Sequence, residues 1–249
     1  MQLYLTLSPL KLAKGLTLGV VFFTLTSIGV QIGKFVFNYR EDWTVMFNVD
    51  REMNLPTFYS ALMLGFCAWL LSAIASGKQA ELEKQKTLSD ANDDAPVKYR
   101  YFQQWKWLSI IFGLLAFDEV FMIHEILIIP DIADALRLPA FLHSMWVIPG
   151  TIVVIVFLRK YWKFWLYLPK KTRYHFALAA SLYISGALLM EMLGSYITVL
   201  ENQQNPIYAG MAIIEEMMEM MGIIVFIYGL LVYIREWQQK INIEIKIII

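Results

Sequence analysis

Long apolar runs separated by polar connections dominate the pattern of this chain. Each run is about twenty residues long, the length that an α-helix needs to cross the roughly 30 Å hydrocarbon core of a membrane. None of the runs alternates with the period of two that strands of a membrane barrel would show. The pattern predicts an all-α integral membrane bundle of about six transmembrane helices. The expected spans are 16–37, 57–76, 107–129, 141–158, 174–200 and 208–234.

Basic residues in the connections predict which way the helices run. Most of the 21 Lys and Arg residues lie in the N-terminal stretch, in the second and fourth connections, and after the last apolar run. Because cytoplasmic loops of membrane proteins are enriched in Lys and Arg, both termini are expected in the cytoplasm. Residues 1–249 are expected to form a single transmembrane domain, with 77–106 a flexible cytoplasmic loop and 235–249 a cytoplasmic tail.

Composition agrees with a membrane protein and excludes several other classes. Hydrophobic residues make up 58% of the chain, whereas soluble domains have roughly 45–50%. The net charge is zero, so no basic surface predicts a nucleic-acid partner. The single Cys67 leaves no intramolecular disulfide to form. The expected partners are the lipid bilayer and a small ion or a membrane-dissolved substrate, and no oligomeric state is predicted.

Acidic side chains inside the apolar runs are the most informative feature of the sequence. A charged side chain near the bilayer centre costs at least ~2.5–3.5 kcal/mol, so such residues pair, take up protons, bind a cation or line a wet cavity. The alternating direction of the helices puts the acids of three runs in the same outer half of the bilayer. They are therefore predicted to form one buried site, made of Asp118, Glu119, Glu125, Glu191, Glu215, Glu216 and Glu219.

The helical phase of these acids supports an inward orientation. Asp118, Met122 and Glu125 are spaced at i, i+4 and i+7 and would share one stripe of the third helix. Glu215 and Glu219 are spaced at i and i+4 on the sixth helix. Each acidic stripe is expected to face the interior of the bundle.

Carboxylates combined with imidazoles are suitable ligands for Mn, Fe or Zn, and the cluster is therefore a predicted divalent metal site. The candidate ligands are Glu119, His124, Glu125, Glu191, Glu215, Glu216 and Glu219. In an enzyme, Asp118 or Glu216 would be the candidate catalytic base beside the metal. Possible additional members are His143 and three residues of the first outer loop, which is expected to fold over the mouth of the bundle: Asp50, Arg51 and Glu52.

Two other cofactors are disfavoured. A haem held by His124 and His143 would have carboxylates as unusual neighbours. The methionines of the fifth and sixth helices resemble Cu(I) ligands, but packing around an irregular site explains these flexible side chains better.

Three functions remain open from the sequence. The leading hypothesis is a divalent-cation site that serves transport or metal-dependent membrane chemistry, and it is compatible with either an enzyme or a carrier. The first alternative is a proton-coupled transporter in which the acids relay protons. The second alternative is a non-catalytic accessory subunit in which the acids tie helices together.

Two motifs stand close to each other in the predicted topology. The first is Asp50-x-Glu52-x-Asn54-Leu55-Pro56-Thr57-x-Tyr59-Ser60, and the second is Leu115-Ala116-x-Asp118-Glu119-x-x-x-x-His124-Glu125. Together they resemble an uncharacterised group of bacterial multi-pass membrane proteins. The resemblance covers the second and third helices and implies that the two motifs belong together. It also implies a bacterial inner membrane as the location. It carries no activity with it.

Overall fold

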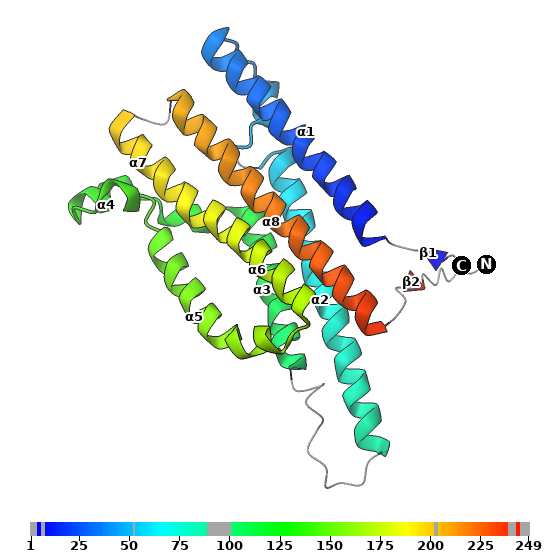
Figure 1. The fold of residues 1–249 in the computed structure, drawn as a ribbon. Coiled ribbons are helices and arrows are strands. Elements are labelled where there is room, and N and C mark those ends of the chain that lie inside the picture. Colours follow the sequence, from blue (N-terminus) through cyan, green and yellow to red (C-terminus); the bar gives the residue numbers. More distant parts are fainter. Residues whose placement is uncertain are drawn as a thin grey trace.

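The regular structure of the chain is helical, apart from one two-residue strand near each end. The computed structural model describes residues 4–5, 8–51, 53–88, 101–201, 204–238 and 243–244. Its long helices are α1 (Pro9–Val36), α2 (Leu55–Leu88), α3 (Phe102–Phe121), α5 (Val147–Tyr167), α6 (Lys170–Ile184), α7 (Glu191–Glu201) and α8 (Pro206–Gln238). The π-helical turn η5 (Ser185–Met190) joins α6 to α7 in one continuous rod (Figure 1).

The two short strands lie together at one end of the bundle. Strand β1 (Tyr4–Leu5) pairs antiparallel with β2 (Ile243–Glu244) (Figure 1). The short elements that connect the helices are η1 (Asp42–Phe47), η3 (His124–Leu127), α4 (Pro130–Ala135) and η4 (Ala140–Leu142).

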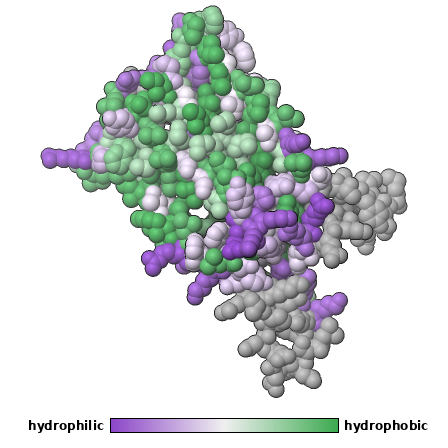
Figure 2. All heavy atoms as spheres, in the orientation of Figure 1, coloured by the Kyte–Doolittle hydropathy of each residue, from purple (hydrophilic) through white to green (hydrophobic). Residues whose placement is uncertain are grey.

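Four helical segments are long and apolar enough to cross a membrane: Pro9–Val36, Leu55–Lys84, Lys170–Glu201 and Pro206–Trp237. Their outward faces carry large apolar side chains, such as Leu18 with 70% and Leu62 with 73% of its surface exposed. Hydrophobic residues cover most of the face seen in Figure 2, whereas soluble monomers rarely expose patches beyond several hundred Å². These features indicate a helical membrane protein.

Helices α3 and α5 are the two predicted spans outside this group of four. They have 20 and 21 residues. Each carries several charged residues, among them Asp118 and Glu119 in α3 and Arg159 and Lys160 in α5. Four of the expected spans are therefore supported by length and composition, and the count of six stays a prediction.

Helix α8 is the central element of the bundle. It packs against α1, α2, α6, η5 and α7. Its Ile227 and Leu230 are fully buried, as are Leu64 and Leu71 of α2. The acids of α8 consequently project among other helices rather than into lipid.

Two glycines let α8 approach the α6–η5 rod at backbone distance. A Cβ added at Gly222 would lie 2.8 Å from the backbone nitrogen of Tyr183 and 3.0 Å from the oxygen of Ala179. A Cβ at Gly186 would lie 2.8 Å from Cγ of Glu219. Small residues at such crossings are typical of helix packing in membranes. This close crossing is what places Tyr183 beside the acids of α8.

The third helix ends earlier than its apolar pattern predicts. Helix α3 ends at Phe121, and Met122 adopts a left-handed backbone conformation with φ of 52°. The short helix η3 follows, and Pro130 begins α4. The predicted continuation to Ile129 is therefore wrong, and Asp118, Met122 and Glu125 do not share a helical stripe. The early end of α3 has a local cause. The Asp118 side chain accepts a hydrogen bond from the backbone nitrogen of His124 at 3.0 Å, which turns the chain back at this point.

Other boundaries also differ from those expected. Helix α2 continues to Leu88 and α3 begins at Phe102, so both ends of the segment 77–106 are helical. Residues 89–100, in the middle of that segment, lie outside the described residues. Helix α5 begins at Val147 rather than at Phe141, because the 3-10 turn η4 and an irregular stretch precede it.

Candidate functional site

A cavity of about 260 Å³ lies between α3, η3, α5, η5, α7 and α8. All seven predicted metal ligands line it, and so do Asp118 and Asp50. Among the described residues that line the cavity, no lysine or arginine is present. The structure thus brings together acids from Asp50 to Glu219, which are far apart in the chain. Their role as metal ligands stays a prediction.

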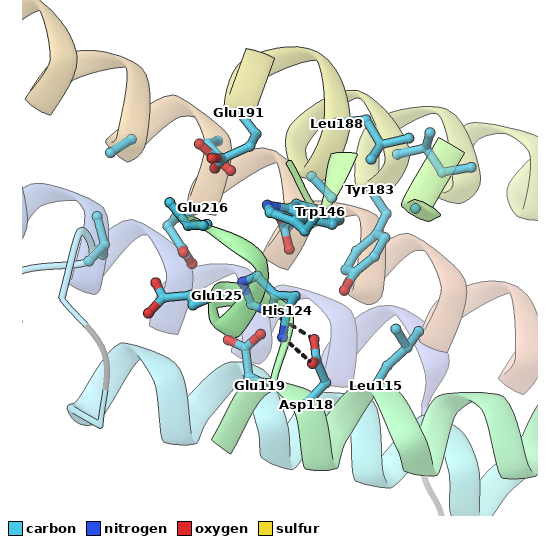
Figure 3. Close-up of a pocket in the computed structure, with 18 of the residues that line it drawn as sticks. Leu115, Asp118, Glu119, His124, Glu125, Trp146, Tyr183, Leu188, Glu191 and Glu216 are labelled. Carbon is cyan, nitrogen blue, oxygen red and sulfur yellow. Dashed lines mark hydrogen bonds and ion pairs between the residues drawn. The ribbon is translucent and has the colours of Figure 1, made fainter. Parts of the chain in front are cut away.

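The ring of His124 is held in place by Asp118. Nδ1 of His124 lies 2.8 Å from Oδ2 of Asp118, and the backbone N–H of His124 donates to Oδ1 at 3.0 Å. The left-handed turn at Met122 folds the chain back so that both contacts form. In Figure 3 the second ring nitrogen faces the side on which Glu125 and Glu216 lie. Asp118 therefore fits the role of a positioning group better than that of the predicted base.

Glu119 is tied to the second helix. Its carboxylate accepts a hydrogen bond from the hydroxyl of Ser60 in α2, and Ser60 is buried. Ser60 belongs to the first of the two sequence motifs and Glu119 to the second. Their contact gives a physical reason for the two motifs to occur together.

Glu191 and Glu215 form a pair of carboxyl groups. Glu191 begins α7 directly after the π-helical turn η5, and such turns are frequent at functional sites. The side chains of Glu191 and Glu215 are joined by a hydrogen bond. An ionised carboxylate is only an acceptor, whereas a protonated one donates. Two ionised carboxylates in contact repel each other, so a proton or another cation would stabilise this pair.

Two residues of the first loop contribute to the lining of the cavity. Val49 and Asp50 line the cavity, and Asp50 accepts a hydrogen bond from the hydroxyl of Tyr208. Burial raises the pKa of the Asp50 carboxyl above its usual value, although the Tyr208 hydroxyl and the charge of Arg51 act in the opposite direction.

Polar side chains buried beneath this loop fix its shape. Gln31 of α1 donates to Oδ1 of Asn48 at 2.8 Å. Asn54 donates to the backbone oxygen of Asn48 at 2.7 Å. The hydroxyl of Ser27 accepts from the backbone nitrogen of Val49 at 3.2 Å. These bonds join the loop that carries Asp50 to α1.

Three of the possible additional members are not placed in the cavity. Arg51 is exposed and does not line it. Glu52 lies outside the described residues. His143 lies elsewhere, with Nε2 hydrogen-bonded to the oxygen of Leu138 at 3.1 Å.

Sequence reasoning missed three aromatic residues of the lining, which are Trp146, Tyr183 and Tyr208. Tyr208 stands seven positions before Glu215 and shares its helical face, so a signal for it was present. Trp146 precedes α5 in an irregular segment, where periodicity gives no signal. Its ring lies 5.1 Å from that of His124, measured between centroids.

The fit to a metal ion is incomplete. Within the described ranges, no three His, Cys, Asp or Glu side chains form a group that could hold a metal ion. One element of a metal site is nevertheless present, because ligating histidines commonly donate their other ring N–H to a carboxylate. His124 and Asp118 have that arrangement.

Comparison with known proteins identifies a family whose description names no function. The family match covers residues 13–234, and therefore every helix around the cavity. The chain belongs to the family described as a domain of unknown function, DUF8692. No curated protein and no solved structure matches it. The predicted membership of an uncharacterised group is thus confirmed.

Proposed function

We propose that this protein is a proton-coupled membrane transporter of a cation, with the carboxylates of the cavity as its exchange site. The main support for this proposal is that every ionisable acidic or basic side chain of the lining, apart from His124 and the tyrosines, is a carboxylate. Carboxylates gathered around one cavity of an apolar bundle cannot all be ionised without compensation. They hold protons, or they hold another cation.

Competition between protons and cation supplies the coupling. In this proposal Glu191 and Glu215 share a proton, which must leave before the pair can bind a cation with full negative charge. Cation binding and proton binding at one set of groups are therefore mutually exclusive, and each ligand lowers the affinity for the other. If the binding site can change from one side of the membrane to the other only when a proton or the cation is bound, the protein exchanges the cation for protons.

We infer six membrane spans for this function. Helices α3 and α5 lie alongside the longer helices of the bundle (Figure 1). An even number of spans agrees with the pairing of β1 and β2 at one end of the bundle. The distribution of Lys and Arg supports a cytoplasmic location for that end, and we propose a bacterial inner membrane as the site of the protein.

Proteoliposomes test this function directly. The purified protein is reconstituted with a pH-sensitive dye inside, and Na⁺, K⁺, Mn²⁺, Zn²⁺ or tetraphenylphosphonium is added outside. At least one cation is expected to drive saturable proton movement that Glu215→Gln abolishes. The control is Glu201→Gln, which changes an exposed acid at the end of α7. Proton movement that is equal in the wild type and in Glu215→Gln would contradict the proposal.

A divalent-metal site is the second candidate, and the Asp118–His124 contact is the observation that favours it. In that case Nε2 of His124 and neighbouring glutamates would hold Mn, Fe or Zn, and the metal would act as a Lewis acid. Glu216 would be the candidate base. Elemental analysis of the purified protein tests this candidate: a near-stoichiometric metal that is lost in His124→Gln supports it, and equal metal content in both proteins excludes it.

A further inference from the structure

The cavity has an acidic side and an apolar side. The acidic side comes from α3, η3, α7 and α8. The apolar side comes from α5 and from the end of the α6–η5 rod, and its residues are Val153, Val154, Ile184, Ala187 and Leu188. An inorganic cation would make no use of this apolar wall.

The apolar side reaches the outer surface of the bundle. Val153 lines the cavity, and yet 66% of its surface is exposed. Its neighbours on α5, Ile152 and Val156, are exposed apolar residues as well. Because this surface is apolar along α5, it faces acyl chains in a membrane. Val153 therefore connects the lining of the cavity to the apolar outer surface of α5.

Trp146 lies where the two sides of the cavity meet. Figure 3 shows its indole close to Glu191, Glu216 and Tyr183, with the ring nitrogen toward the two glutamates. That nitrogen is buried, and it has no hydrogen-bond partner among the described residues. Buried indole N–H groups usually have an acceptor. An aromatic face beside carboxylates also suits a protonated amine.

We propose that the transported cation is a single-chain amphiphile with an amino-alcohol headgroup, an inference that rests on the proposed function. The protonated amine lies among Glu191, Glu215 and Glu216. The hydroxyl oxygen accepts the hydrogen bond of the Trp146 indole. The alkyl chain leaves past Leu188 and Val153 into the lipid. The cavity volume of about 260 Å³ suits a headgroup whose alkyl chain lies outside the cavity. Pockets that enclose a whole drug-sized molecule are larger, at roughly 300–1,000 Å³.

Proton release from protein in phosphatidylcholine nanodiscs tests the ligand class. The probe is 2-aminohexadecan-1-ol, and the comparison compounds are hexadecan-1-ol, hexadecyl sulfate and hexadecylamine. The amino alcohol is expected to release protons at about tenfold lower mole fraction than hexadecylamine, a difference that Trp146→Phe removes. The alcohol and the sulfate are expected to release none.

A substitution at Val153 tests the path of the ligand's alkyl chain. Val153→Trp fills the proposed exit of the alkyl chain at an exposed position and is expected to weaken the response to the amino alcohol about tenfold. The matched control is Ile152→Trp, which changes an exposed residue of α5 that does not line the cavity. Its response is expected to equal that of the wild type.

The outcomes separate this inference from the function on which it rests. Proton release by Na⁺ or Mn²⁺ but by neither amine would overturn the amphiphile and leave the proton-coupled transporter in place. Equal responses of Val153→Trp and Ile152→Trp would overturn the lateral path. Release by none of the cations would overturn the proposed function itself.

Discussion

Nδ1 of His124 lies 2.8 Å from Oδ2 of Asp118, across the left-handed turn at Met122 that ends α3. The pair joins a helix end to the 3-10 turn η3, and it fixes a titratable ring within an acidic cavity. In the neutral ring, a carboxylate at Nδ1 selects the tautomer in which Nδ1 carries the hydrogen and Nε2 is an acceptor.

Asp118→Asn is expected to reverse this tautomer, because the amide of asparagine can donate to Nδ1. The loss of a charge-assisted bond, discounted for partial exposure, is expected to lower the free energy of unfolding by about 1 kcal/mol. Nitrogen-15 NMR of the histidine rings measures the tautomer, and thermal unfolding measures the stability. Asp131→Asn, at an exposed position of α4, is the control. An unchanged His124 signal in Asp118→Asn would show that Asp118 does not set the tautomer.

Gly222→Ala is expected to destabilise the bundle, because the new methyl group would lie 2.8 Å from a backbone nitrogen of the neighbouring rod. Backbone atoms cannot move aside as a flexible side chain can, so the expected loss is about 1–3 kcal/mol.

Gly210→Ala is the matched control for Gly222→Ala. Gly210 lies in α8 as well, and a Cβ there would meet no atom within 4 Å. This control is expected to be neutral or up to about 1 kcal/mol more stable, since alanine favours a helix over glycine. The melting temperatures of the two variants in one detergent give the comparison. Equal melting temperatures would mean that α8 does not cross the α6–η5 rod at backbone distance.

Asp50 is expected to make the stability of the loop depend on pH. Burial raises the pKa of Asp50 in the folded protein above its usual value of 3.8, so the folded state keeps a proton that the unfolded state has already lost. Stability from this group is therefore complete at low pH, and it falls as the pH rises from 3.8 through the raised pKa. The charged groups that act on Asp50 are Arg51 and Lys34, which lower its pKa, and Glu125, which raises it.

Asp50→Asn removes this titration while keeping a neutral side chain of similar size. The variant is expected to gain stability relative to the wild type as the pH rises from about 4 to about 8. Melting temperatures of both proteins across this range measure the difference. A difference that shrinks with rising pH would contradict the assigned direction of the pKa shift.

Much of the architecture follows from the sequence, because hydropathy and helix direction alone determine it. The apolar runs predicted the long helices, and the alternating direction predicted that Glu191 and Glu215 would meet although they lie on different helices.

The details that failed depend on side-chain contacts, which a hydropathy pattern does not contain. The end of α3 is set by Asp118 folding back on the backbone of His124, within a run that remains apolar to Ile129. Trp146 reaches the cavity from an irregular segment, where no periodic face exists. The hydrogen bonds that join the first loop to Gln31 and Ser27 of α1 are likewise absent from any local pattern.

Infrared difference spectroscopy of the protein in lipid, recorded on addition of a transported cation, tests the central claim most directly. Protonated and ionised carboxyl groups absorb at different frequencies, so displacement of the shared proton at Glu191 and Glu215 would be visible. We predict that the cation removes a protonated-carboxyl band in the wild type and in Glu201→Gln. In Glu215→Gln the same band is expected to be missing from the difference spectrum. A spectrum in which the cation changes no carboxyl band of the wild type would contradict proton exchange at this cavity.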